Sequence, residues 1–367
     1  MGDLLSRAWE VLTRRIDNFL FGCALALVCV GLVTLFSASD QSAARVTTQV
    51  LSCAFALVLM WVVANIPPQT LARAAVPLYV LAVALLVGVA LFGVVVNGSR
   101  RWLNIGVARI QPSELMKIAL PLMLAWYFQK FEGRINWKDF AVAAVLIVVP
   151  VYLIKRQPDL GTALLIAASG CYVLYLAGLS WKIIVGLVGL AGAAGPYVWA
   201  HLHDYQRERI LTFIDPTRDP LGTGYHSTQA SIAIGSGGVI GKGWLNGTQT
   251  HLDFLPERHT DFIFAVFGEE FGLIGNALLL VLYLLLIGRA MMITANASTL
   301  FARLMAGAVT LMFFTYAFVN MGMVSGLLPV VGVPLPLVSY GGTALVSLFI
   351  GLGILMSVQA HRKLVTT

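Results

Sequence analysis

The chain has 367 residues, of which 59% are hydrophobic and 11% are charged, and its mean hydropathy is +0.85. A composition this apolar excludes an ordinary soluble domain. The formal net charge is +7, but in so apolar a chain we expect contact with a membrane and not with nucleic acid. All 4 cysteines lie in apolar runs without CxxC or Cys/His metal spacing, so we expect neither a disulfide framework nor a metal site built on cysteines.

Apolar runs long enough to cross a bilayer recur along the whole chain. A transmembrane helix needs about 20 mostly apolar residues for about 30 Å of hydrocarbon, and about ten such runs are present. The predicted spans are residues 18–37, 47–66, 75–96, 113–131, 139–154, 159–178, 182–200, 261–288, 301–325 and 336–359. We therefore expect an all-α polytopic membrane protein, with one membrane domain over residues 1–367.

Basic residues before the first span predict the orientation. Arg7, Arg14 and Arg15 place the N-terminus in the cytoplasm by the positive-inside rule, and an even number of spans returns the C-terminus to the same side. Residues 201–260 then form one large extracytoplasmic loop. This topology divides the 24 Lys and Arg residues evenly between the two sides, so the count does not support the orientation. The outward positive charge fits an anionic ligand, or anionic lipid headgroups.

Charged residues surround the start of the fourth span. Arg101 lies in the preceding loop beside Trp102, and its planar guanidinium suits a phosphate group. Ser113 follows a proline and is expected to cap the helix. Glu114 and Lys117 are three residues apart, share a helix face and can pair. This pair either holds the fourth helix in the bundle or contributes to a binding site.

Two further polar motifs precede the eighth span. Asp159 stands at the start of the sixth span, where either helix capping or a role in a site explains it. The glycine-rich residues 235–243 fit neither a Walker A loop nor the GxGxxG spacing. We expect them to form a tight loop that lets a ligand approach the backbone, with Lys242 available to it.

Asp261 stands where the long polar loop meets the eighth span, close after Arg258. Ionisable groups at this depth are costly and mark functional positions, so Asp261 is the candidate catalytic residue. Glu269 and Glu270 follow on different faces of the same helix. At least one of them is expected to pair with another helix, through Arg289 or Arg303.

A proline- and glycine-rich stretch interrupts the last apolar region before Ser339. Non-helical backbone at membrane depth is tolerated only where protein or a watery cavity surrounds it, so we expect a short re-entrant loop. Four spans thus begin at the outer surface with polar groups: Glu114 and Lys117, Asp159, Asp261 and Ser339. Their convergence predicts one site at the outer end of the bundle.

The order of these motifs resembles the SEDS family (shape, elongation, division and sporulation) over essentially the whole chain. The resemblance is carried by Arg101-Trp102, Gln111-Pro-Ser-Glu114-x-x-Lys117, Gln157-Pro-Asp159-Leu-Gly-Thr162, Gln229-Ala-Ser-Ile-Ala-Ile-Gly-Ser-Gly-Gly, Gly241-Lys-Gly, Gly247-Thr-Gln249, Phe254-Leu-Pro-Glu-x-His-Thr-Asp-Phe262, Gly268-Glu-Glu270 and Pro336-Leu-Val-Ser-Tyr-Gly-Gly342. The short segment before the first span favours the branch that serves cell elongation and rod shape.

The resemblance implies a peptidoglycan glycosyltransferase of the bacterial cytoplasmic membrane that uses lipid II and faces the periplasm. It implies as partners a class B penicillin-binding protein, which supplies transpeptidation, and the elongation proteins MreC and MreD. On the family pattern, Asp261 matches the acid required for polymerisation. A divalent cation, Mg²⁺ or Mn²⁺, remains open as a cofactor.

The expected chemistry is a single displacement. Asp261 is the expected general base on the acceptor hydroxyl, and Arg101, Lys117, Lys242 and Arg258 are the cations available to the leaving pyrophosphate. The alternatives are a lipid II flippase and a non-catalytic scaffold for wall synthases. Transporters usually show internal repeats and polar groups near the midplane, whereas these groups cluster at the outer end.

Overall fold

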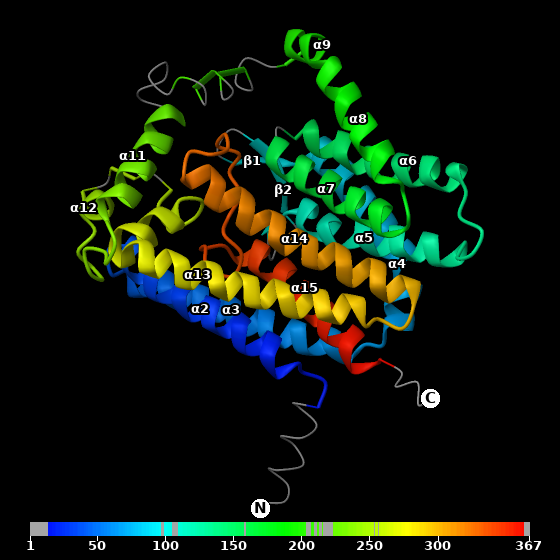
Figure 1. Cartoon of the computed structure of the whole chain (residues 1–367), viewed down its shortest axis with the longest axis horizontal. Helices are drawn as coiled ribbons and strands as arrows, with labels where there is room; N and C mark the ends of the chain where they lie inside the picture. Colours follow the sequence, from blue (N-terminus) through cyan, green and yellow to red (C-terminus); the bar gives the residue numbers. More distant parts are fainter. Residues whose placement is uncertain are drawn as a thin grey trace, which may run out of the picture.

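The computed structural model describes residues 14–96, 99–104, 109–157, 159–202, 207–208, 211–212, 215, 223–252, 254–255 and 257–362. Arg7, used above for the orientation, lies outside them. The elements are α2 (Asn18–Ala38), α3 (Ala43–Asn65), α4 (Pro68–Phe92), β1 (Val94–Val96), β2 (Ser99–Asn104), β3 (Arg109–Ile110), α5 (Pro112–Lys130), α6 (Trp137–Lys155), α7 (Leu160–Leu176), α8 (Trp181–Ala193), α9 (Gly195–Ala200), α11 (Thr223–Ser236), α12 (Thr248–His251), α13 (Ile263–Ala295), α14 (Leu300–Val324) and α15 (Gly342–Ala360). Long helices form a bundle, and α11 and α12 lie at one end of it (Figure 1).

The predicted helical membrane fold is confirmed. In the described part of the chain, 7 helices are long and apolar enough to cross a membrane: α2, α3, α4, α6, α13, α14 and α15. Each of the other predicted spans also coincides with helix. α7 is apolar but has 17 residues, α5 carries charged residues, and residues 182–200 are divided between α8 and α9. The chain is a multi-pass membrane protein.

Two details of the prediction were wrong. The predicted third span, residues 75–96, is not helical to its end, because α4 ends at Phe92 and residues 94–96 form β1, which joins β2 and β3 in a 3-stranded antiparallel sheet. The last helix begins at Gly342 and not at residue 336, so Ser339 lies in the turn before α15 and not in its first turn. Prolines and glycines keep residues 326–341 largely non-helical, as the expected re-entrant loop requires. Of the large polar loop, the described part contains α11 and α12.

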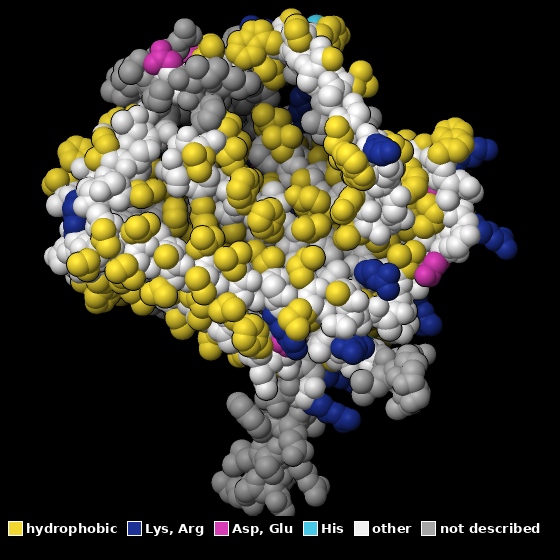
Figure 2. Space-filling view, in the orientation of Figure 1, with side chains coloured by type: hydrophobic (Ala, Val, Ile, Leu, Met, Phe, Trp, Pro, Cys, Tyr) yellow, Lys and Arg dark blue, Asp and Glu magenta, His cyan; other side chains and the backbone are white. Residues whose placement is uncertain are grey.

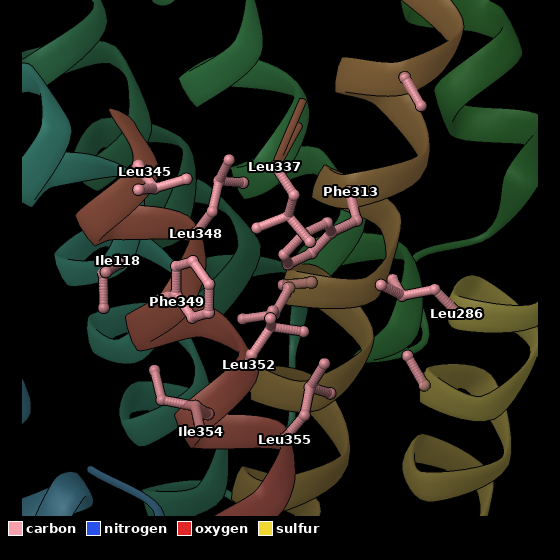
Figure 3. Close-up of a cluster of buried hydrophobic side chains, with 14 of the residues drawn as sticks. Ile118, Leu286, Phe313, Leu337, Leu345, Leu348, Phe349, Leu352, Ile354 and Leu355 are labelled. Carbon is pink, nitrogen blue, oxygen red and sulfur yellow. The ribbon is translucent and has the colours of Figure 1, made fainter. Parts of the chain in front are cut away.

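α14 and α15 are the inner helices, each with 67% of its most apolar window buried. α15 passes close to α3, since a side chain at Gly353 would come within 2.6 Å of the Met60 carbonyl oxygen. The core gathers side chains from α5, α13, α14 and α15 and from the segment before α15 (Figure 3): Ile118, Leu286, Phe313, Leu337, Leu345, Leu348, Phe349, Leu352, Ile354 and Leu355. In a bilayer such close packing holds helices together, because lipid tails are as apolar as the side chains.

The surface divides as a membrane protein requires. Hydrophobic side chains cover the flank of the bundle over α13, while Lys and Arg gather near the end where the C-terminus and the loop from α5 to α6 lie (Figure 2). Leu273 and Leu278 of α13 are among the apolar side chains that are more than half exposed. This flank therefore fits contact with lipid.

The helical geometry of α13 is interrupted near its N-terminal end. Gly272 has φ 65° and ψ −162°, and a side chain there would come within 2.3 Å of the Gly241 backbone nitrogen. The glycine-rich residues 235–243 enter this break: Leu273 N donates to the carbonyl of Gly238 at 3.0 Å, and Lys242 N donates to that of Glu269 at 3.1 Å. The glycine-rich backbone does allow a close approach, and the element that approaches it is α13.

Candidate functional site

Asp261 lies in the turn directly before α13 and is half-buried. The Asn320 side chain of α14 donates to the Asp261 carbonyl oxygen at 2.8 Å and to the Val333 carbonyl oxygen at 2.6 Å. Gly332 has φ +71°, and a side chain on it would come within 3.3 Å of the Asp261 carboxylate. The segment between α14 and α15, residues 326–341, therefore passes directly against this carboxylate, and we call it the cover segment.

Ser339 fastens the cover segment to the turn that holds Asp261. Its hydroxyl donates to the Thr260 carbonyl oxygen at 2.6 Å and accepts from Leu335 N at 2.8 Å. Tyr340 N adds a bond to the carbonyl oxygen of His259 at 2.9 Å. The structure thus gives Ser339 backbone bonds that position Asp261, while its predicted place in a binding site stays a prediction.

Gln49 and Asn320 support the site but were not among the predicted site residues. Gln49 of α3 donates to the Ser339 carbonyl oxygen and accepts from Gly341 N, both at 3.3 Å. Both side chains are buried. A lone amide inside an apolar run is the signal that could have found them, because a buried amide needs partners.

The predicted pair of Glu114 and Lys117 is confirmed, with 2.6 Å between Lys117 Nζ and Glu114 Oε1. Ser347 of α15 donates to the other carboxylate oxygen at 2.8 Å, and Lys117 Nζ lies 5.0 Å from the ring centroid of Tyr316. Lys117 is buried. The pair therefore joins α5, α14 and α15 inside the bundle.

The prediction that Ser113 caps α5 was wrong. Gln111 is the N-cap, Pro112 occupies the first turn and Ser113 is buried within the helix. Proline suits the first helical position because its φ is already helical and its missing N–H leaves no bond unmade.

Asp159 caps its helix and also pairs with Arg101, while its role in a site stays a prediction. One carboxylate oxygen caps α7 by accepting from Thr162 N at 3.2 Å, and the other lies 3.5 Å from the Arg101 guanidinium on β2. A side chain on Gly161 would come within 2.6 Å of the Val331 carbonyl oxygen. The start of α7 is thereby packed against the cover segment.

The cover segment is what brings the predicted residues together. Val331 lies against the start of α7, Gly332 leaves little room for a larger side chain beside the Asp261 carboxylate, and Val333 packs with Tyr316, the neighbour of Lys117. Six predicted site residues thus lie around one non-helical segment: Arg101, Glu114, Lys117, Asp159, Asp261 and Ser339. The predicted convergence of these groups holds.

Lys242 is drawn into a different cluster. Its Nζ lies 2.7 Å from Glu269 Oε1 and donates to Thr248 Oγ1 at 2.7 Å. Glu269, fully buried, also accepts from the backbone N–H groups of Gln249 at 3.0 Å and Thr250 at 3.3 Å. We call this cluster the α13 clamp, because it fastens α12 and the glycine-rich loop to α13.

Arg258 also has protein partners, since it pairs with Asp40 and donates to the Thr250 carbonyl oxygen. The expectation that Arg289 or Arg303 neutralises Glu269 or Glu270 was wrong. Glu270 accepts from Ser37 and from Leu245 N.

Arg289 instead pairs with Asp17, 2.5 Å away at the opposite end of the bundle. It stands near the far end of α13, five to six turns from the two glutamates, which is too far for contact.

His259 is the titratable neighbour of the Asp261 turn. Burial, together with the charge of Arg45, lowers the pKa of His259 below its ordinary value, and Glu257 only partly offsets this. Its imidazole is therefore neutral at pH 7 and lies edge-on to Tyr340, with 5.9 Å between ring centroids. A neutral ring adds no positive charge that would make the nearby carboxylate a weaker base.

An apolar cavity of about 250 Å³ opens beside the site, between α7, α14 and the cover segment. Leu165, Thr315, Val331 and Val333 are among the residues that line it. Val331 and Val333 flank Gly332, so the cavity begins next to the residue that touches Asp261. An apolar chain attached to a group at Asp261 fits this position.

The described part of the chain contains no cluster of three or more His, Cys, Asp or Glu side chains that could hold a metal ion. Around the cover segment, Glu114 is paired with Lys117 and Asp159 with Arg101. These carboxylates do not fit a protein-bound divalent cation, because each already neutralises a cation of the chain.

Comparison with known proteins finds relatives along the whole chain. The FtsW/RodA/SpoVE family model, described as "Cell cycle protein", matches residues 17–364. The chain is 52% identical over 343 residues to the peptidoglycan glycosyltransferase MrdB of Escherichia coli K12, covering 93% of each protein. It is 34% identical over 361 residues to stage V sporulation protein E of Bacillus subtilis, covering 95% of this chain and 98% of that protein.

Two solved structures share the fold. One belongs to a peptidoglycan synthase complex described as coordinating polymerization and crosslinking, with a TM-score of 0.83, 34% identity, and coverage of 95% of this chain and 98% of that one. The other is the rod shape determining protein RodA of Thermus thermophilus, with a TM-score of 0.71, 30% identity, and coverage of 94% and 97%.

Proposed function

The chain belongs to the FtsW/RodA/SpoVE family and is a peptidoglycan glycosyltransferase of rod-shape elongation, and we propose that it polymerises lipid II at the Asp261 site. The observation that supports this site most is the position of the cover segment. Asp261, the Asp159–Arg101 pair and the Glu114–Lys117 pair all lie around it. A base, cations for a phosphate leaving group and an apolar cavity are the parts that transfer from a lipid-linked sugar requires.

In the proposed reaction Asp261 acts as the general base. It takes the proton from the 4-hydroxyl of the acceptor GlcNAc, whose oxygen forms a bond to C1 of the donor MurNAc. The bond from C1 to the pyrophosphate oxygen breaks, and undecaprenyl pyrophosphate leaves with the electron pair. Attack from the face opposite the leaving group inverts C1 from α to β. Asn320 and Ser339 hold the backbone on both sides of Asp261 and thereby aim its carboxylate.

Arg101 and Lys117 are the cations best placed for the leaving pyrophosphate. Both belong to pairs that pack against the cover segment or its neighbours, and a preorganised cation stabilises charge as it develops. Lys242 and Arg258 were predicted for the same role, but their described pairs, with Glu269 in the α13 clamp and with Asp40 after α2, are not with residues that pack against the cover segment. We therefore assign these two a structural role first. The polyprenyl chain of the donor is placed in the apolar cavity beside Gly332.

We infer ten transmembrane spans with both termini in the cytoplasm, because helix coincides with every predicted apolar run and arginines precede the first one. The chain then lies in the bacterial cytoplasmic membrane with the Asp261 site facing the periplasm. Lipid II, a class B penicillin-binding protein, MreC and MreD are the proposed partners. The solved relative within a peptidoglycan synthase complex supports the transpeptidase partner.

The Glu114 and Asp159 carboxylates already have partner cations and do not suit a bound metal, so the proposed mechanism assigns no metal to them. The flippase alternative has no observation in its favour here, because the paired charges lie at the starts of α5 and α7 and not at their middles.

The test is glycan-strand formation from purified lipid II in detergent, with and without the transpeptidase partner. Wild-type protein should form polymer, and Asp261→Asn should form none while eluting as a folded species. The matched control is Glu132→Gln, which neutralises an exposed acid at the far end of α5 and should polymerise normally. Normal polymerisation by Asp261→Asn would end the general-base assignment. Absence of polymer from every protein, with transport of lipid II across liposomes instead, would support the flippase.

A further inference from the structure

A second cavity lies at the end of the bundle opposite Asp261. It has a volume of about 250 Å³ and is formed by the start of α4, the end of α5 and the start of α14. α13 runs its full length between the Asp261 turn and this end, because it begins at Ile263 and ends at Ala295, shortly before α14 begins. The reaction proposed above uses none of the residues that line this cavity.

The lining of the cavity is positively charged. Arg73 of α4 and Lys130 of α5 line it together with the amide side chains of Gln69 and Gln129. Among the described residues that line it none is acidic, and no described carboxylate forms an ion pair with Arg73 or Lys130. Two cations with amide donors beside them offer a phosphate group both charge and hydrogen bonds.

Two acids stand near this end of α5. Glu132, just after the helix, is exposed and forms none of the described ion pairs with Arg73 or Lys130. Asp139, in the first turn of α6, accepts from the Tyr127 hydroxyl at 3.1 Å and from Asn136 N at 2.7 Å. The start of α14 adds a favourable dipole, because Thr299, which caps this helix of 25 residues, also lines the cavity. The electrostatic field inside the cavity therefore favours an anion.

The surroundings of the cavity indicate a lipid. Trp126 lines it, with Lys130 Nζ 5.6 Å from its ring centroid, and tryptophan beside a basic residue is typical of the level of lipid headgroups. Val80 lies two turns along the same face of α4 as Arg73 and is 59% exposed, as a lipid-facing residue would be. A ligand with a phosphate group at the cavity and apolar chains along α4 fits both features.

We propose that this cavity binds the phosphate group of an anionic phospholipid, at the end of the bundle away from the glycosyl-transfer site. Arg73 and Lys130 contact the phosphate oxygens, and the amides of Gln69 and Gln129 bind the rest of the headgroup. The acyl chains lie along the exposed face of α4. Under the topology proposed above, the lipid belongs to the cytoplasmic leaflet, but the site itself follows from the lining residues.

The test is native mass spectrometry of the full chain in neutral detergent, titrated with dioleoyl phosphatidylglycerol. The variants are Arg73→Gln, Lys130→Gln and the two combined, and the control is Lys138→Gln, an exposed lysine near this end that does not line the cavity. We expect about fivefold weaker binding for each single variant and about thirtyfold for the double, and less than twofold for the control. Each variant must elute and unfold like wild type without added lipid.

Two competitors identify the ligand. Dioleoyl phosphatidylcholine has the same chains and a phosphate but no net charge, and it should bind at least tenfold more weakly than the anionic lipid. Equal binding of the two lipids, or unchanged lipid binding by the double variant, would overturn the proposal. Displacement of the lipid by millimolar inorganic phosphate would assign the cavity to a free phosphate instead. Neither readout requires polymerisation, so the result is independent of the Asp261 mechanism.

Discussion

The start of α13 and its break about three turns later both contain acidic side chains, and the two regions are built differently. At the start, Asp261 is half-buried, and a non-helical segment with a glycine touches its carboxylate. At the break, Glu269 is fully buried and accepts hydrogen bonds from Lys242 and from two backbone N–H groups. The comparison teaches that an acid saturated by its own fold holds structure together, whereas a positioned and accessible acid is available for chemistry.

After the loss of Asp261 itself, the largest effect is expected from removing both charges of the buried Glu114–Lys117 pair near the cover segment. The double variant Glu114→Gln with Lys117→Met leaves no uncompensated charge, so stability should change by less than about 1 kcal/mol. Polymerisation should nevertheless fall by about 100- to 1,000-fold, because a cation for the leaving pyrophosphate is lost. Thermal unfolding and polymerisation rates measured on the same preparation check both statements. A well-folded double variant with normal activity would show that this pair is structural only.

The next effect concerns the α13 break. In Gly241→Ala the new methyl group would lie 2.2 Å from the Glu270 carbonyl oxygen, at a position with φ +86°. Overpacking and backbone strain together should lower the free energy of unfolding by about 3 kcal/mol. Gly235→Ala is the matched control, since Gly235 lies in α11 with nothing within 4 Å, and it should be neutral or slightly stabilising. Equal thermal unfolding of the two variants would refute the described docking of the glycine-rich loop.

Much of this organisation could be predicted from the sequence. Apolar runs located every helix of the bundle, and polar groups at the starts of the runs at Glu114, Asp159 and Asp261 predicted the candidate site, because burying a charge in a bilayer is rarely tolerated without a function. The pairing of Glu114 with Lys117 followed from helix geometry alone. These predictions rest on local pattern and membrane depth.

The partners across the fold could not be predicted in the same way. Lys242 pairs with a glutamate 27 residues later, and Arg258 with Asp40 at a separation of 218 residues. Such pairs depend on how α2, α11 and α13 are arranged in space, which helix periodicity does not encode. Gln49 was missed for the same reason, because its partners lie in a segment about 290 residues away. The glycines of residues 235–243 likewise predicted that another group would come close to this backbone, but they did not predict that this group would be α13.

A smaller effect is expected from Glu269→Gln in the α13 clamp. The amide keeps some hydrogen bonds but leaves Lys242 without its partner charge. Because the Lys242 side chain is 27% exposed, water offsets part of the loss, and we expect a destabilisation of about 2 kcal/mol. Thermal unfolding in detergent measures it, with the exposed Glu257→Gln as the control that should stay within about 0.5 kcal/mol. An unchanged unfolding temperature in Glu269→Gln would show that the α13 clamp does not stabilise the fold.

The smallest effect is a pH dependence at the other end of α13. Burial raises the pKa of Asp17, but hydrogen bonds from Arg289 and from Leu20 N outweigh it and hold that pKa below its ordinary 3.8. A depressed folded-state pKa contributes stability that is present above pH 4 and is lost as the pH falls through the folded value. Asp17→Asn should therefore lower stability by about 1 kcal/mol at pH 7 and by less at acidic pH. Unfolding temperatures of both proteins across this range test it, and an equal difference at every pH would contradict the pairing.

The central claim is that the acid at the start of α13 performs chemistry while the acid at its break holds structure. The most direct test measures the polymerisation rate per folded molecule, together with the unfolding temperature, for Asp261→Asn and Glu269→Gln side by side. We predict that Asp261→Asn unfolds like wild type and polymerises at least about 1,000-fold more slowly. Glu269→Gln should unfold at a lower temperature and retain most of its rate below it. A fully active Asp261→Asn, or a stable but inactive Glu269→Gln, would contradict the account.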